Sequence, residues 1–139
     1  MIVVDTNVLS EVMRPNPSAR VVNWIERQSA DELFTTAITV GEIYYGIQLL
    51  PKGKRRDNLF AAAEVIFNHD FRDRALAFTA EAARIFSEIY ARRRLAGRRV
   101  GQSDAQIAAI TRLHGATLAT HNVADFEGCG IRLFDPWQE

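Results

Sequence analysis

Short apolar runs alternate with longer amphipathic stretches along the chain. Uninterrupted aliphatic and β-branched residues predict buried strands at 2–4, 33–38, 75–78, 117–119 and 131–134. Between them, apolar residues recur every three or four positions and predict helices at 8–13, 18–28, 39–50, 55–68, from 79 past 90, and 103–114. Strands that alternate with helices favour an α/β fold: three α/β/α layers around a central parallel sheet of about five strands.

Composition narrows the class of protein. The 139 residues are 47% hydrophobic and 24% charged, which predicts a single globular domain over 1–139. Lys plus Arg and Asp plus Glu are 17 each, so any attraction to nucleic acid must come from local clusters. With Cys129 alone an internal disulfide is impossible, which favours a reducing compartment. No signal peptide or membrane helix is predicted, so we expect a cytoplasmic protein without a membrane partner.

Four acids fall where a parallel sheet would bring them together. Ligands of open α/β sheets bind beyond the carboxyl ends of the strands. Asp5 ends the first strand, Glu42 lies early in the helix after the second, Asp104 begins the helix before the fourth, and Asp125 follows the fourth. Four clustered carboxylates repel one another unless a cation compensates, and Mg²⁺ and Mn²⁺ prefer oxygen ligands. The pattern therefore predicts a divalent metal site suited to phosphoryl chemistry.

Each acid also has a purely structural interpretation. Thr39 and Glu42 fit a capping box, as do Ser103 and Gln106, which would leave Asp104 as a first-turn acid that matches the helix dipole. Asp5 could cap the short helix that starts near residue 8, and Asp125 could be a turn residue. Taken jointly, four acids at one sheet edge favour the metal site.

Basic residues form two clusters that contain no acid. One is Lys52 with 54–56, and the other covers 92–99; together they hold nine of the 17 cations. The second cluster leads directly into Asp104, which suggests phosphate contacts, although a solvated helix end would look the same. The candidate RNA contacts are Arg92, Arg93, Arg98 and Arg99.

Four blocks in this order resemble the PIN-domain ribonucleases, and more narrowly the VapC/FitB-type toxins of bacterial toxin–antitoxin pairs. They are IVVDTN at 2–7, TVGE at 39–42, DAQIAA at 104–109 and ATHNVADF at 119–126. The resemblance implies a Mg²⁺- or Mn²⁺-dependent endoribonuclease with a neutralising antitoxin and toxin homodimers. By position it assigns the metal to Asp5, Glu42 and Asp104, with Asp125 as the fourth acid.

The resemblance also assigns supporting roles and contains one departure. Thr6 would be the polar neighbour of Asp5, and Asn122 a further supporting residue. The family usually has a basic residue before this Asn, whereas this chain has His121. The departure leaves the acids intact, but it could alter pH dependence or a substrate contact.

The predicted reaction is in-line hydrolysis of an RNA phosphodiester, which would leave a 5′-phosphate because no 2′-hydroxyl attack is needed. One alternative is a non-catalytic module of the same fold that binds RNA or protein. Another is a phosphatase with Asp5 as covalent nucleophile, but the second Asp of such enzymes is replaced here by Asn7.

Overall fold

The computed structural model describes residues 1–138, so the last residue of the predicted domain lies outside the described part. Five parallel strands form one sheet in the order β3-β2-β1-β4-β5. The strands are β1 (Ile2–Val4), β2 (Leu33–Thr36), β3 (Ala75–Leu76), β4 (Thr117–Ala119) and β5 (Arg132–Phe134). All five predicted strands are present, and the predicted α/β fold with a parallel sheet is confirmed.

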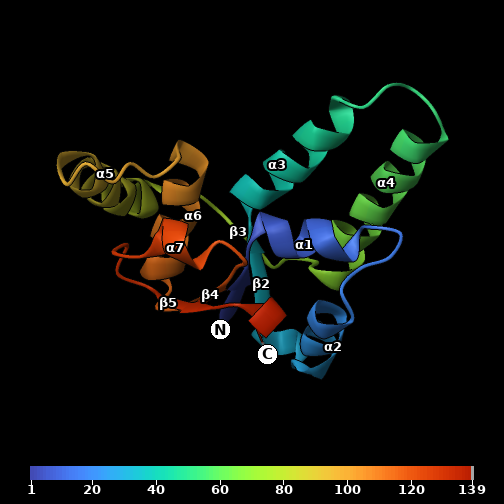
Figure 1. Cartoon of the computed structure of the whole chain (residues 1–139), viewed down its shortest axis with the longest axis horizontal. Coiled ribbons are helices and arrows are strands. Elements are labelled where there is room, and N and C mark those ends of the chain that lie inside the picture. Colours follow the sequence, from blue (N-terminus) through green and yellow to red (C-terminus); the bar gives the residue numbers. More distant parts are fainter. Residues whose placement is uncertain (139) are drawn as a thin grey trace.

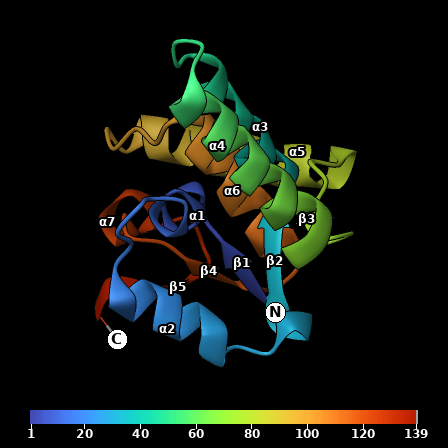
Figure 2. The same cartoon turned by 90° about the vertical axis from the view of Figure 1, so that its right-hand side faces the viewer.

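Helices cover both faces of the sheet (Figure 1). One group is α1 (Thr6–Val12), α2 (Ala19–Arg27), α3 (Ala37–Gln48) and α4 (Lys54–Val65), which continues as a π-helical turn, η2 (Ile66–Asp70). The other is α5 (Ala80–Leu95), α6 (Gln102–Leu113) and α7 (Val123–Phe126). Short 3₁₀ turns, η1 (Ala30–Glu32) and η3 (Pro136–Gln138), complete the described chain. Turning the molecule by 90° shows α3 and α4 side by side as a hairpin (Figure 2).

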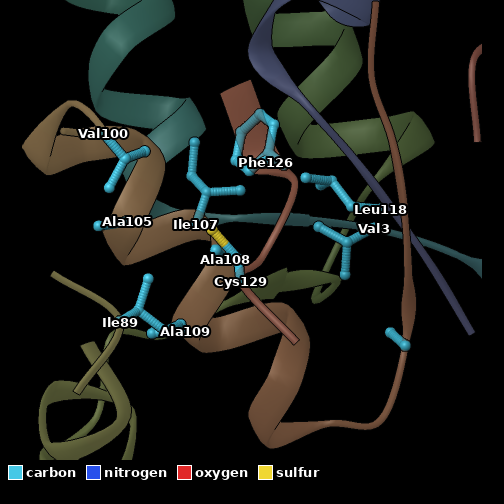
Figure 3. Close-up of a cluster of buried hydrophobic side chains, with 11 residues drawn as sticks. Val3, Ile89, Val100, Ala105, Ile107, Ala108, Ala109, Leu118, Phe126 and Cys129 are labelled. Carbon is cyan, nitrogen blue, oxygen red and sulfur yellow. The ribbon is translucent and has the colours of Figure 1, made fainter. Parts of the chain in front are cut away.

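Successive side chains of each short strand point to opposite faces of the sheet, so every strand can contribute to the hydrophobic core on each face. Val3 and Leu118 point into the cluster beneath α5 and α6, whereas Val4 and Ala119 point into the cluster beneath α1 to α4. Figure 3 shows the first cluster, in which Val3 and Leu118 meet the side chains of α6 and the loop after α7. Strands with buried side chains on both faces account for the uninterrupted apolar runs in the sequence.

Several helix starts differ from the prediction by one or two residues; α1, for example, begins at Thr6 rather than Val8. α3 begins at Ala37 rather than Thr39, because the Thr36 hydroxyl accepts from the Thr39 N–H and caps the helix earlier. α6 begins at Gln102 after Gly101, so the predicted Ser103 capping box is wrong. The strand predicted at 75–78 ends at Leu76. None of the helices within residues 1–138 has both the length and the apolar character needed to cross a lipid bilayer.

Candidate active site

Sheet topology brings distant residues to one edge. β1 lies in the centre, and the chain first builds outward through β2 and β3 before it crosses to β4 and β5. This change of direction creates a topological switch point beyond the carboxyl ends of β1 and β4, where open α/β sheets bind ligands. α3 starts at that edge because it follows β2, and α6 starts there because it runs back toward the beginning of β4. The sequence did not show at which edge of the sheet α6 begins. In the structure it begins at the edge where Asp5 lies, as the predicted site requires.

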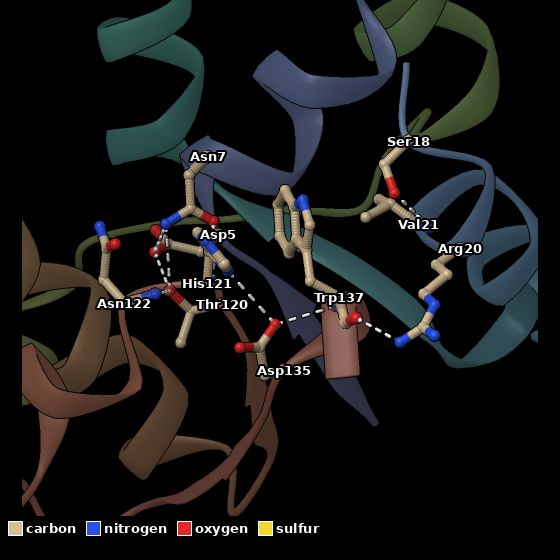
Figure 4. Close-up of polar contacts among 10 residues, drawn as sticks. All are labelled: Asp5, Asn7, Ser18, Arg20, Val21, Thr120, His121, Asn122, Asp135 and Trp137. Atoms are coloured by element: carbon tan, nitrogen blue, oxygen red, sulfur yellow. Dashed lines mark hydrogen bonds and ion pairs between the residues drawn. The ribbon is translucent and has the colours of Figure 1, made fainter. Parts of the chain in front are cut away.

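Asp5 occupies the switch point and is only 3% exposed. Its Oδ1 accepts from the Thr6 N–H (2.8 Å), and its Oδ2 accepts from Thr120 Oγ1 (2.7 Å) and Asn7 Nδ2 (3.3 Å; Figure 4). Burial raises the pKa of the Asp5 carboxyl, these hydrogen bonds oppose the rise, and the negative charge of Glu42 adds to it. Asp5 also caps α1, so its capping interpretation is confirmed, and the same side chain is a candidate metal ligand.

Glu42 is held by a hydroxyl from another element rather than by its own helix start. It lies in the second turn of α3, where its Oε1 accepts from Thr6 Oγ1 at 2.7 Å. Thr6 Oγ1 also lies 3.0 Å from Thr39 Oγ1, which in turn lies 3.3 Å from Thr36 Oγ1. The capping-box interpretation of Glu42 is therefore wrong, and a line of three threonine hydroxyls fixes its position instead.

Asp104 lies in the first turn of α6, as predicted, and is half-buried. The pKa of its carboxyl is raised to about 6. Burial is the largest cause, followed by the negative charges of Asp5, Glu42 and Asp125. The geometric link among the acids is Thr6, which hydrogen-bonds to both Asp5 and Glu42. An excess of negative charge at this depth is the situation that a divalent cation relieves.

The segment after β4 adds the fourth acid. Asp125 is exposed and lies on α7, rather than in the simple turn that was one of its interpretations. Asn122 precedes α7 and joins the network through its main-chain N–H, which donates to Thr120 Oγ1 (3.1 Å). His121 donates its main-chain N–H to Asn7 Oδ1 (3.2 Å), while its ring packs on Trp137 and approaches Asp135 (Figure 4).

Three polar residues of the site were not predicted from the sequence. The amide of Asn7 bridges Asp5 and Thr120 and so ties the end of β1 to the end of β4. Thr120 is fully buried and donates to Asp5, and Thr39 supports Thr6. Asn7 and Thr120 follow strands at the same edge as Asp5, so a search for polar as well as acidic residues after each strand would have found them.

The basic cluster at 92–99 divides between surface and interior. Arg92, Arg98 and Arg99 are exposed, as an RNA contact requires. Arg93 is buried, and its guanidinium donates to main-chain carbonyls, so the prediction that it contacts RNA is wrong. A signal was present in the sequence: Arg93 follows the buried Ile89 by four residues, so it lies on the inward-facing apolar stripe of α5, unlike its neighbours.

The donor set fits a hard divalent cation. Asp5, Glu42, Asp104 and Asp125 are oxygen donors with a mutual excess of negative charge. Within residues 1–138, no three His, Cys, Asp or Glu side chains lie close enough together to hold a metal ion as they stand. Mg²⁺ commonly binds through one or two carboxylates and keeps several waters, so it does not need such a preformed cage.

An apolar groove begins beside Glu42. It lies between α1, α3 and α4, has a volume of 680 Å³, and includes Met13, Ile47 and Leu59 in its lining. Lys54 and Arg55 lie along the same groove. An apolar channel with a carboxylate and two cations at its margins is suited to a protein segment.

The fold and the site together define a class: an α/β protein with acidic residues at the switch point of a parallel sheet. The family model of the PIN domain matches residues 2–127. The chain belongs to the PIN-domain family.

Three relatives resemble almost the whole chain. Plasmid stability protein StbB of Pseudomonas syringae pv. tomato is 40% identical, and VapC ribonuclease Y4jK of Sinorhizobium fredii is 35% identical; each comparison covers 99% of both chains. Toxin FitB of Neisseria gonorrhoeae is 34% identical over 100% of both chains. The crystal structure of FitAcB from that organism superposes with a TM-score of 0.92, also over 100% of both chains.

Proposed function

We propose that this protein is a divalent-metal-dependent endoribonuclease that acts as the toxin of a toxin–antitoxin pair. The observation that carries the proposal is the placement of the acids at one edge of the sheet: Thr6 hydrogen-bonds to both Asp5 and Glu42, and Asp104 and Asp125 follow elements that reach the same edge. The relative Y4jK, which is named a ribonuclease, supports RNA as the substrate. The single buried cysteine, Cys129, is compatible with the reducing cytoplasm, where RNA is available.

Asp5, Glu42 and Asp104 would hold the metal, and Asp125 would extend the donor set toward solvent. A bound divalent ion lowers the pKa of an attacking water and neutralises charge that develops on the phosphate. The chain's own contribution is to fix the donors before substrate arrives. Thr120 and Asn7 orient Asp5, and Thr6 orients Glu42. Preorganised donors of this kind need little rearrangement when the ligand binds.

RNA would approach over the exposed Arg92, Arg98 and Arg99. Their guanidinium groups can contact the phosphate backbone without reading its sequence. Asp125 is the exposed member of the acid group, so it marks the side from which a phosphodiester reaches the buried members. Hydrolysis at this site is expected to leave a 5′-phosphate end.

Cleavage of total RNA by the purified protein tests this function. We expect cleavage with Mg²⁺ or Mn²⁺, none with EDTA, and a loss of about a hundredfold or more in Asp5→Asn, because a metal ligand is removed. Asp73→Asn is the matched control: Asp73 is 95% exposed, and Asn tolerates its positive φ of 57°. Unchanged cleavage in Asp5→Asn would contradict the assigned site.

Absence of cleavage with either metal would instead favour the non-catalytic binding module. The phosphatase alternative has no support from the site, because Asn7 uses its amide to hold Asp5 and Thr120 in place. Ligation of adaptors that require a 5′-phosphate would identify the product ends.

An antitoxin is the proposed protein partner, and we assign it to the groove beside Glu42. FitB is named a toxin, and the crystal structure of FitAcB superposes on the whole chain. Gly46 lines the groove, and a Cβ at this position would meet nothing within 4 Å. Gly46→Gln is therefore expected to weaken antitoxin binding, measured by calorimetry, and to leave RNA cleavage intact. Gly41→Gln, also on α3 but outside the groove lining, is the control; equal affinities would reject this location.

A homodimer is the second proposed assembly. Large apolar side chains are exposed on α3 and α5, with Tyr45 67% and Leu95 87% exposed. Burial of such residues between two copies would remove apolar area from water. Light scattering during size-exclusion chromatography is expected to give twice the 15.6 kDa chain mass, and the mass of a single chain would exclude the dimer.

A further inference from the structure

The last turn of α5 carries three consecutive arginines with different environments. Arg92 and Arg94 are exposed, whereas Arg93 is 7% exposed. Arg93 Nε donates to the carbonyl of Arg98 (2.6 Å), and its Nη1 donates to the carbonyls of Asp125 (3.0 Å) and Glu127 (2.7 Å). One guanidinium thus binds the main chain of two segments that are distant in sequence.

The acceptors around Arg93 indicate what it holds. A buried charge is tolerated only when its donors are satisfied, and the recorded acceptors are three carbonyls and, at 3.6 Å, the Cys129 thiol. Carbonyl oxygens cannot turn away as a side chain can, so these bonds fix backbone positions. Arg93 also lies beside the apolar cluster of Figure 3, where Val100, Phe126 and Cys129 pack together. Removal of the guanidinium would leave buried carbonyls without donors.

The two segments that Arg93 joins each carry an acid of the site. The Arg98 carbonyl belongs to the loop that turns at Gly97 and leads into α6, which begins two residues before Asp104. The Asp125 carbonyl belongs to α7 itself, so Arg93 binds the backbone of the fourth acid directly. Arg93 is therefore placed to set the spacing between Asp104 and Asp125.

We infer that Arg93 is a positioning residue of the acidic site: its guanidinium holds the α5–α6 loop and α7 together, and so fixes Asp104 relative to Asp125 for a divalent cation. The inference rests on the proposed function and deepens it. Arg93 touches neither substrate nor metal in this role. Its effect passes through the backbone, which distinguishes it from the phosphate contacts expected of Arg92, Arg98 and Arg99.

The test measures Mn²⁺ affinity of the full chain by electron paramagnetic resonance of the free ion. Arg93→Met is expected to weaken binding about tenfold or more, in the range typical of outer-shell residues. Arg94→Met changes the adjacent, exposed arginine and should bind Mn²⁺ like the wild type. Arg93→Lys keeps the charge but loses the planar fork, so an intermediate affinity is expected. If Arg93→Met does not fold, as judged by circular dichroism, Arg93→Lys decides the result.

Two further measurements separate positioning from other roles. In an Asp125→Asn background, Arg93→Met should change Mn²⁺ affinity by less than about threefold, because the spacing it maintains no longer matters. An undiminished effect there would contradict the inference. A raised KM for RNA with unchanged Mn²⁺ affinity would also contradict it, since that is the signature of a phosphate contact.

The inference and the proposed function fail in different ways. If Asp5→Asn leaves Mn²⁺ binding as it is in the wild type, the metal site and the role of Arg93 are both wrong. If Asp5→Asn abolishes binding but a folded Arg93→Met binds Mn²⁺ like the wild type, only the role of Arg93 is wrong.

Discussion

Asp5 illustrates how one side chain can serve the fold and the site together. It caps α1 with one carboxylate oxygen and accepts from Thr120 and Asn7 with the other. These bonds offset part of the desolvation that burial imposes on the carboxylate, to which the negative charge of Glu42 adds. Burial raises the pKa of the Asp104 carboxyl to about 6, and the negative charges of Asp5, Glu42 and Asp125 add to this rise. A bound cation would offset the repulsion among these charges.

The charge of Asp104 is expected to destabilise the metal-free protein above pH 6. The folded-state pKa is about 6 against an ordinary value of 3.8, so the penalty is complete above pH 6 and fades as pH falls toward 4. With EDTA at pH 7.5, Asp104→Asn should raise the free energy of unfolding by about 1 kcal/mol, a value reduced for solvent screening because the group is half-buried. Urea unfolding at pH 7.5 and pH 4 measures the difference.

The control for this experiment is Asp73→Asn, whose carboxylate is 95% exposed and should leave the urea midpoint unchanged at both pH values. Addition of Mn²⁺ at pH 7.5 should make the wild type more stable than Asp104→Asn, because only the wild type keeps the full set of metal donors. A stabilisation by Asp104→Asn that is as large at pH 4 as at pH 7.5 would exclude the electrostatic explanation.

At the scale of elements, the start of α3 connects secondary structure to the site. Thr36 caps the helix, and its hydroxyl begins the line through Thr39 and Thr6 to Glu42. Thr79 caps α5 in the same way, by accepting from the N–H of Ala82. Within residues 1–138, its hydroxyl does not hydrogen-bond to the four acids or to the threonines that support them. A comparison of variants at the two caps can therefore distinguish a loss of helix stability from a change in the geometry of the site.

Thr36→Ala and Thr79→Ala are each expected to cost about 1 kcal/mol of stability, because each loses an N-cap bond. Only Thr36→Ala should also weaken Mn²⁺ binding, by about tenfold, since Thr39 and Thr6 lose their support beside Glu42. Thermal unfolding and Mn²⁺ titration of both variants measure the two effects. Equal Mn²⁺ affinities would show that the hydroxyl line does not position Glu42.

At the scale of the whole molecule, the 17 basic and 17 acidic residues give a formal net charge of zero. Long-range attraction to RNA must therefore come from the uneven distribution of the basic residues. Arg92, Arg98 and Arg99 are exposed at the end of α5 and in the following loop, close in sequence to Asp104. Affinity for RNA is thus expected to depend on salt through this cluster.

Replacement of these three arginines by Gln should reduce the salt dependence of RNA binding. For single-stranded RNA, loss of three phosphate contacts lowers the slope of log affinity against log salt concentration by about 2. Binding is best measured in Asp5→Asn, which avoids cleavage, by fluorescence anisotropy at several salt concentrations. Arg72→Gln with Arg84→Gln is the control, and a control slope that falls equally would place the RNA elsewhere.

Local patterns predicted most of the fold because strands and helices follow from the period of apolar residues. All five strands were found, as were the Ser18 and Thr79 caps and the C-terminal Gly115 of α6, whose φ of 61° suits glycine. The start of α3 was misplaced by two residues because Thr36 and Thr39 are both good N-cap residues. Local sequence could not choose between them.

The sequence by itself placed Asp5, Glu42 and Asp125 after strands of a predicted parallel sheet, whereas the position of Asp104 depended on the route of α6. Tertiary structure alone decided how those acids are held. Glu42 binds Thr6, which is 36 residues away, and Thr120 binds Asp5 across 115 residues. It also decided which carbonyls Arg93 binds, since those of Asp125 and Glu127 lie 32 and 34 residues away. Such contacts depend on the order of strands and the rotation of helices, which packing selects after the local elements exist.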